Sequence, residues 1–490
     1  MAVVTWTGST DTDYGTAGNW DTGSVPTSSD DVIIADVTNN CVLDGSRSVN
    51  SFTVLSGGDF NGNTEMLTVV GEADGSGATS NGFAVNIDGV IVGTTTDITV
   101  TTPTATTVDF YAQGGGKVRH VTINHASCVA TLGALLDISG DLTITAGELN
   151  TNSGSNYAVT VTGACEVTGT LTCNDSAVTL GSLEVVSGAT FNAPSDSGSG
   201  LLTIGNVTQS TAAGVRGFYV SDGATFAHNS GTIKFTGTQG ISPCHGGTAT
   251  YNNVTFAQSG TIEYKDTRTG SDNWIIVGTL TINAGATLTN QNEADRINCT
   301  GDCSVSGVLD LNHASGGDHN FGSLTIASGG TYSATSGTTT ITGETASHAW
   351  NNTGGTFTHN NGKVKIYDAT GTVMGSTSVR ENTFYDLEIS LHVATYTCSL
   401  YDVSGNAVTI LNNLDVTKGE VEFSTASDTI TIHGLTNISS NAEFNDNVGH
   451  DTNKIIHNGL VTNKGTYNIS DGTTVKMNGG IRNLGTITVK

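Results

Sequence analysis

The sequence is poor in basic residues and in long apolar runs. It holds 17 Lys and Arg against 44 Asp and Glu, a formal net charge of −27 over 490 residues. Nucleic acid is not expected as a partner, because phosphate binding needs clustered Lys and Arg. An anionic membrane surface is disfavoured for the same reason. No run approaches the ~20 apolar residues of a membrane helix, so no membrane partner is expected.

A secretion leader is also missing from the sequence as it stands. Residues 1–6, MAVVTW, carry no basic region followed by a long apolar region. We expect a protein that stays in the cytosol, or one that leaves the cell by lysis as part of a particle.

Proline and helical periodicity are scarce as well. There are only 4 prolines, 12% charged residues and 36% hydrophobic residues, which argues against disorder. Apolar and polar residues alternate, as in Leu280-Thr281-Ile282, so each strand has one inward and one outward face. Glycine is abundant at 64 and punctuates these runs as turns. The pattern predicts an all-β protein.

What is present is a long internal repeat. Strand-like runs open at Val121, Val254 and Leu387, at intervals of 254 − 121 = 133 and 387 − 254 = 133. Three further landmarks follow each opening in the same order, beginning at Asp141, Thr279 and Asn413, at Val159, Ile297 and Ile430, and at Gly181, Gly322 and Gly459. A sandwich does not predict ordered repeats, and propeller blades are ~40–50 residues long. The favoured fold is a right-handed parallel β-helix (solenoid) built of three repeats.

The repeat suggests a division of the chain. We expect an N-terminal cap or attachment element at 1–50, irregular first coils at 51–116, and solenoid units at 117–250, 251–383 and 384–490. The first coil of a solenoid has no neighbour on one side. Large aromatic residues suit such a cover, so Trp6 and Trp20 are the predicted cap or attachment residues.

The opening carries a resemblance. The pattern Gly18-Asn19-Trp20…Val25-Pro26…Asp30-Asp31-Val32-Ile33-Ile34 resembles the N-terminal opening of phage and bacterial surface β-solenoid proteins, of the virion fibre, tailspike or capsid decoration type. The close resemblance is confined to this opening, and the rest of the chain is similar only in its solenoid style. It implies a place on the virion surface, capsid or tail proteins as partners, and a homotrimer.

The 8 cysteines form no CxxC pair. Cys299 and Cys303 flank a turn, a spacing that is a weak indication of a metal site. Cys299 occupies the repeat position of Val161 and Ile432. We therefore favour buried free thiols over metal ligands or disulfides.

Few residues suggest chemistry. His313, Asp318 and His319 lie close together in the sequence and could bind a metal, although a polar turn is favoured. His228 and His359 recur in two units, which indicates a structural role. Candidate carboxylates for acid–base work, with two nearby arginines, carry no diagnostic motif and are read as loop polarity: Asp11, Asp13, Asp21, Asp266, Glu293 and Asp295, with Arg268 and Arg296. No cofactor is expected, and structural Ca²⁺ stays open.

Aromatic residues are the remaining candidates for a binding surface. Four of them could stack on sugars or contact a partner, or could instead fill the core, which is favoured: Trp274, Trp350, Tyr385 and Tyr401.

Together these features predict a non-enzymatic structural or adhesive rod on the surface of a virus particle, such as a capsid decoration, head fibre or tail fibre. Host surface glycans are a candidate ligand. The alternatives are a bacterial extracellular adhesin or matrix protein at the cell surface, and a tailspike-type polysaccharide depolymerase.

Overall fold

The chain folds as a parallel β-solenoid of about 18 turns. The computed structural model describes residues 2–73, 82–196, 200–245, 249–265, 273–290, 296–312, 316–346, 348–371, 374–401, 407–423, 429–445, 454–470 and 472–489. The chain divides into two compact units, Met1–Gly247 and Thr248–Lys490. Within the described ranges the sole helical element is a 3₁₀ turn, η1 (Ala17–Asn19). The all-β parallel architecture predicted from the alternation is confirmed.

The first unit is built on parallel ladders that run from turn to turn. One ladder joins β1 (Ala2–Trp6), β2 (Asp30–Ile34), β5 (Ser51–Val54) and β8 (Phe83–Ile87) in chain order. A second joins β4 (Arg47–Val49), β7 (Met66–Val69), β10 (Thr96–Val100) and the long strand β12 (Val118–Leu132). A third joins β3 (Cys41–Val42), β6 (Asp59–Asn61) and β9 (Val90–Ile91). Each turn of the chain therefore adds one strand to each ladder.

The predicted cap segment, 1–50, joins this stack through β1 and β2, and differs from later turns in the loop between them. Asn19 is fully buried in that loop, where its side-chain oxygen accepts the N–H groups of Thr10 and Asp11 and its amide donates to Asp11 Oδ1 and to the Asp13 carbonyl. Trp20 donates from Nε1 to the Tyr14 carbonyl at 2.8 Å. The Asn-Trp pair of the opening thus organises the loop.

Three aromatic rings fill the space under that loop. Trp6, Tyr14 and Trp20 are all buried, and the Trp20 ring meets the other two edge to face at 5.1 and 4.7 Å between centroids. The Trp6 Nε1 donates to the Asn39 carbonyl at 2.8 Å. The rings therefore form a small buried cluster in the N-terminal segment, and the cap role of Trp6 and Trp20 stays a prediction.

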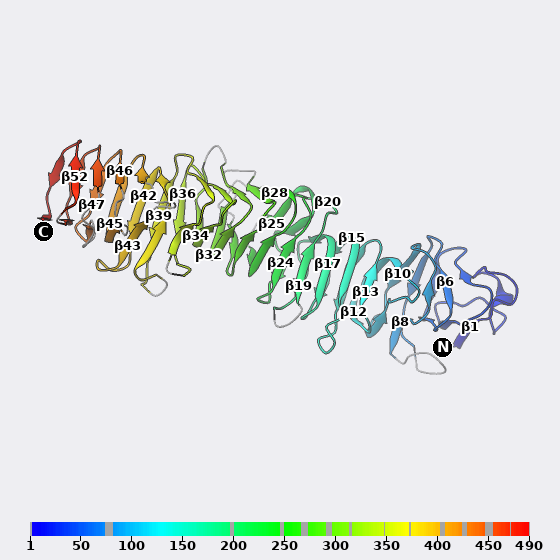
Figure 1. Cartoon of the computed structure of the whole chain (residues 1–490). Coiled ribbons are helices and arrows are strands. Elements are labelled where there is room, and N and C mark those ends of the chain that lie inside the picture. The colour runs from blue at the N-terminus through cyan, green and yellow to red at the C-terminus, as the bar shows by residue number, and fades with distance from the viewer. Residues whose placement is uncertain are drawn as a thin grey trace. The chain divides into compact units, whose positions relative to one another are not determined.

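The second unit repeats the parallel scheme. Its central ladder joins β29 (Asn273–Ile276), β32 (Arg296–Val305), β34 (His319–Ile326), β36 (Thr338–Ile341), β39 (Lys363–Tyr367), β42 (Asp386–Ser390) and β45 (Leu414–Phe423). Figure 1 shows β34, β36, β39 and β42 lying side by side in chain order. This ladder carries the site described below.

Equivalent repeat positions pair in the same way. Val121 lies opposite Leu142 on β14 (Leu142–Asn150), Val254 on β27 (Asn253–Phe256) lies opposite Leu280 on β30 (Leu280–Ile282), and Leu387 lies opposite Leu414. The residues predicted to point inward are all at most 1% exposed: Val121, Ile123, Leu142, Ile144, Val159, Val161, Val254, Leu280, Ile282, Leu387, Leu414 and Ile432. The predicted core positions are confirmed within each unit.

Stacked glycines let the turns close up at one corner. A Cβ on Gly301 would lie 2.0 Å from the Gly278 carbonyl oxygen, and one on Gly322 would lie 2.6 Å from the Gly301 carbonyl oxygen. Any side chain there would push successive turns apart. At this corner the pairing of β32 with β34 shifts in register between Cys299 and Asp302, which ends the regular face that the two strands share.

All 8 cysteines are buried and free, which settles the alternative between thiols and disulfides. Cys165 on β15 (Val159–Val167) lies opposite Leu142, and Cys303 lies opposite Leu280. Burial raises the pKa of the Cys299 thiol to about 12. These side chains pack as small apolar residues at equivalent places in the ladder.

Candidate functional site

The alternation of the central ladder in the second unit places polar side chains in a shallow depression. Ile297, His319, Thr339, Val364 and Leu387 point inward and are buried. Their neighbours point outward and line a depression of about 400 Å³, which we call the polar trough: Arg296, Asn298, Asp318, Asn320, Thr338, Thr340, Lys363, Lys365 and Glu388. The buried Ile297 also borders this depression.

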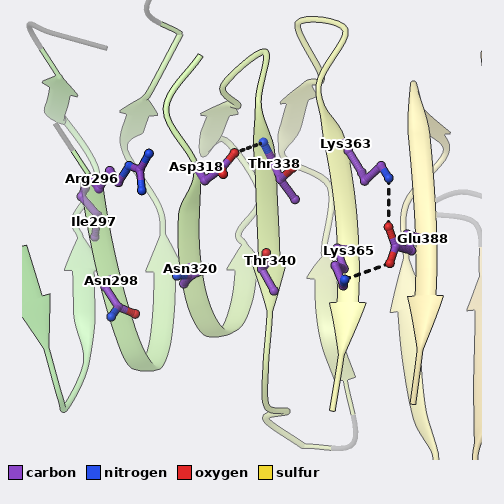
Figure 2. Close-up of a pocket in the computed structure, with 10 residues that line it drawn as sticks. All are labelled: Arg296, Ile297, Asn298, Asp318, Asn320, Thr338, Thr340, Lys363, Lys365 and Glu388. Atoms are coloured by element: carbon purple, nitrogen blue, oxygen red, sulfur yellow. Dashed lines mark hydrogen bonds and ion pairs between the residues drawn. The ribbon is translucent and has the colours of Figure 1, made fainter. Parts of the chain in front are cut away.

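The trough consists of two parallel rows of side chains, one residue per turn (Figure 2). The first row runs Arg296, Asp318, Thr338 and Lys363. The second row runs Asn298, Asn320, Thr340 and Lys365, and its members are direct register partners. Glu388 continues the second row on the next turn. Because successive turns are ~4.8 Å apart, each row is a series of hydrogen-bonding groups at constant spacing.

Glu388 fixes the two lysines of the trough. Lys363 Nζ lies 2.9 Å from one carboxylate oxygen and Lys365 Nζ lies 2.9 Å from the other. Burial opposes ionisation of Glu388, but the hydrogen bonds from the two lysines outweigh it and hold the pKa of Glu388 below its ordinary value. One carboxylate therefore holds two ammonium groups, which leaves a positive charge at this end of the trough.

The opposite end of the trough holds Arg296 and Asp318. Asp318 Oδ1 accepts the backbone N–H of Thr338 at 2.8 Å. Arg296 Nε is buried and has no hydrogen-bond partner within the described ranges. Beneath them His319 accepts the Ile297 N–H at Nδ1, and burial lowers the pKa of His319 to about 4. The floor of the trough is therefore neutral at physiological pH.

An aromatic ring borders the second row. Tyr367 is 37% exposed and lines a neighbouring depression that shares Asn298, Asn320, Thr340 and Lys365 with the trough. Lys365 Nζ lies 4.9 Å from the centre of the Tyr367 ring. A partly exposed ring can pack on the apolar face of a sugar. The amides, hydroxyls and ammonium groups beside it can form hydrogen bonds with the hydroxyl groups of the same sugar.

Two aromatic residues named as candidates from the sequence lie elsewhere. Trp274 is 1% exposed and Trp350 is fully buried, so the core alternative holds for both and neither ring is available to a ligand. The Trp350 ring packs edge to face on Phe357 at 4.7 Å. Tyr385 and Tyr401 are half-buried, and Tyr385 stacks on His359 at 5.6 Å. None of the four lines the trough.

The other sequence candidates divide into two groups. Asp266, Arg268, Glu293, Asp295 and His313 lie outside the described residues. His228 and His359 each accept, at Nδ1, the N–H of the residue two positions on, at 2.9 and 3.0 Å. The recurrent histidine therefore closes the same turn twice, which is a structural role.

The acidic residues of the N-terminal loop bind the loop itself. Asp11 accepts the Asp13 N–H and the Asn19 amide, and these hydrogen bonds lower the pKa of Asp11. Asp21 accepts the Thr5 N–H at 3.0 Å. Asp11 and Asp21 therefore act as local acceptors that shape the N-terminal loop.

A partly buried carboxyl group of the first unit, Asp109, has a raised pKa. Asp109 closes β11 (Ala105–Asp109), and burial raises its pKa to about 6, with the nearby charge of Asp88 adding to the shift. The Asp109 Oδ1 accepts the Tyr111 N–H at 2.8 Å. A raised carboxyl pKa can mark an acid catalyst, and burial likewise raises the pKa of Glu184 in this unit and of Glu381 in the second.

Within the ranges that the structure covers, no three His, Cys, Asp or Glu side chains come together as metal ligands. The same ranges hold no helix with the length and apolarity to cross a membrane.

Sequence reasoning named Arg296 and Asp318 but not their partners in the trough. Lys363 and Lys365 stand at alternate positions of a strand, and Asn298 and Asn320 stand one turn apart in this ladder. The alternation of Lys363-Val364-Lys365-Ile366 could have marked the face, but the register that gathers the rows is not visible in the sequence.

No protein-family model, no curated protein and no solved structure matches the chain.

Proposed function

We propose that this chain is a non-enzymatic adhesive β-solenoid that binds polysaccharide along the polar trough. The observation that carries the proposal is the pair of outward rows, which repeat amide, hydroxyl and ammonium groups at one residue per turn. A polymer with repeated hydroxyl groups is a matching ligand. Side chains on strands of a rigid ladder are held in place before the ligand arrives, which lowers the entropic cost of binding.

The spacing of the carboxylates favours binding over cleavage at this site. Asp318 and Glu388 are separated by three turns of the ladder, so about 14 Å at ~4.8 Å per turn. Glycosidases place their two carboxyl groups roughly 5–9.5 Å apart. The depolymerase alternative would have to use another site, and Asp109 is the described carboxyl with the most suitable pKa.

The location belongs to the same proposal. The Asn19-Trp20 opening resembles that of virion and bacterial surface solenoids, and the proposed location is the surface of a phage particle, where a homotrimer is held by capsid or tail proteins. We also propose that the turns are right-handed, as connections between parallel strands are in about 98% of cases, and that they form three repeats. Immunogold labelling of purified particles tests the location, and labelling of the bacterial envelope alone would favour the adhesin.

The binding test uses immobilised bacterial surface polysaccharides and a matched pair of variants. Thr340→Ala removes a hydroxyl from the trough, whereas Thr462→Ala removes one from the same register row on β50 (Val461–Asn463), beyond the trough. We expect about fivefold weaker binding for the first variant, the cost of one hydrogen bond, and no change for the second. Release of oligosaccharides during the incubation would overturn the non-enzymatic proposal.

A further inference from the structure

The polar trough carries an excess of positive charge in a strongly acidic protein. Three of the chain's 17 basic residues line it, together with two carboxylates, while the whole chain has a net charge of −27. A small cationic depression attracts negatively charged groups, whereas the surrounding acidic surface repels them. Negative groups of a ligand are therefore favoured in the trough and disfavoured elsewhere on the surface. The ligand of the trough is therefore expected to carry negative charge.

The two ends of the trough differ in how their cations are held. Lys363 and Lys365 share Glu388, and their side chains stay 33% and 29% exposed. An ammonium group has three N–H donors, so each lysine keeps donors for a ligand. Both are already fixed in position.

Within the described ranges, Arg296 is the trough cation that forms no ion pair with a carboxylate. In the described part of the chain no hydrogen bond is made by its buried Nε, in contrast to the paired lysines. A guanidinium group stays charged at all physiological pH values and binds a carboxylate through two parallel N–H donors. Figure 2 shows this side chain at the end of the first row, next to Asp318.

The spacing of these cations limits the kind of anion. Arg296 and Lys363 stand on turns that are three steps apart, about 14 Å at ~4.8 Å per turn. The groups between them in the second row are the neutral Asn298, Asn320 and Thr340. The pattern fits an extended polymer with separated negative charges and with hydroxyl groups between them.

We propose that the polar trough selects a carboxylated polysaccharide, a polymer that contains uronic or other acidic sugars, and that Arg296 binds its carboxylate. A nucleic acid fits less well, because it has a phosphate on every nucleotide while the trough offers three cations and the remaining surface is acidic. This inference rests on the proposed function, since it names the class of polysaccharide bound at the same site.

The test measures binding of the full chain to alginate, polygalacturonate and hyaluronan, each beside its carboxyl-reduced derivative, with dextran sulfate and single-stranded DNA as further probes. We expect at least one uronate polymer to bind, and to bind roughly tenfold more weakly after carboxyl reduction. The binding should weaken as NaCl is raised, because part of it is ionic.

Two trough variants and one control identify the residues. Arg296→Gln and Asn298→Asp should each weaken binding of the uronate polymer about tenfold, and should weaken binding of the carboxyl-reduced form by a smaller factor. Arg482→Gln removes the same charge at a position beyond the trough, on the continuation of the second row, and should change neither. Far-UV circular dichroism and the melting temperature check that each variant is folded.

The outcomes separate the two proposals. Equal binding of a polymer and its carboxyl-reduced form would overturn the acidic ligand and keep polysaccharide binding. Tightest binding to dextran sulfate or to DNA would also overturn the carboxylate assignment. If no polysaccharide of the panel binds, acidic or reduced, both this inference and the proposed function are wrong.

Discussion

Tyr467 Oη lies 2.9 Å from Nε2 of His457, and the hydroxyl of Thr436 lies 2.8 Å from Nδ1 of the same ring. His457, Thr436 and Tyr467 are all buried inside the second unit. A neutral imidazole has one donor nitrogen and one acceptor nitrogen, so it serves both neighbours at once. Burial opposes the charged form and lowers the pKa of His457 to about 4.

The first prediction concerns acid stability. The pKa values of His457 and His319 are about 4 in the folded chain against 6.5 for a solvated histidine, so below pH 6.5 the unfolded chain takes up protons that the folded chain does not. The contribution of the two neutral histidines to the free energy of unfolding is fully present above pH 6.5 and is lost as the pH falls toward 4. At pH 5 the loss is about 2 kcal/mol for each histidine, measurable by urea unfolding at pH 7.5 and pH 5.

Substitutions assign the loss to these rings. His457→Asn should reduce the difference between the two pH values by about half, although it also lowers stability at pH 7.5. The exposed His433 gives the matched control, and His433→Asn should keep the full difference. An unchanged pH dependence in His457→Asn would show that its protonation does not drive the effect.

The second prediction concerns the cap. Asn19→Ala removes an acceptor from two backbone N–H groups and a donor from Asp11 Oδ1 and the Asp13 carbonyl. Because the groups are buried or partly buried, we expect a loss of about 2–4 kcal/mol in the free energy of unfolding. Ser28→Ala, at an exposed position in the same loop, should be neutral within about 0.5 kcal/mol. Equal stability of the two variants would contradict this role of Asn19.

The third prediction concerns Asp109. Its pKa is raised from 3.8 to about 6 mainly by burial, so ionisation at neutral pH costs free energy in the folded state. Asp109→Asn keeps an acceptor for the Tyr111 N–H and should stabilise the protein by about 1 kcal/mol at pH 7.5, after allowance for solvent screening. The gain should vanish below pH 3.8, where the carboxyl is protonated in both states. A loss of glycan-cleaving activity in this variant would instead reveal a catalytic acid.

The fourth prediction separates core aromatics from surface aromatics. Trp350→Ala should cost about 3–5 kcal/mol in stability because it opens a cavity in the core. Tyr367→Ala, at a ring that is 37% exposed, should weaken polysaccharide binding with a change in stability of less than about 1 kcal/mol. Thermal melts and binding isotherms of both variants check this. A Tyr367→Ala variant that binds as well as the unaltered protein would remove the ring from the site.

The fifth prediction concerns the thiols. All 8 cysteines are buried and free, and thiol reagents attack the thiolate. Ellman's reagent should label none of them in the native protein at pH 8, and all of them after unfolding in guanidinium chloride without reductant. Fast labelling of even one native thiol would contradict the packing described for that cysteine.

The sequence was a good guide to the interior and a poor guide to the site. Val121, Val254 and Leu387 could be placed in the core because alternation and repetition both mark inward positions. Trp274 and Trp350 show the limit, since residue type alone does not tell a core ring from a surface ring. The partnership of Glu388 with Lys363 and Lys365 depends on the register between successive turns, and turns of unequal length hide that register in the sequence.

The two-row arrangement of the trough has a consequence for how this protein can change. Outward residues such as Thr340 occupy the opposite side of the strand from inward neighbours such as Thr339 and Ile341. Replacement of an outward residue alters one point of contact with the ligand and leaves the core intact. Duplication of a whole turn would insert one more contact point into each row. If the trough binds the proposed ligand, ligand preference can diversify one turn at a time without a new fold.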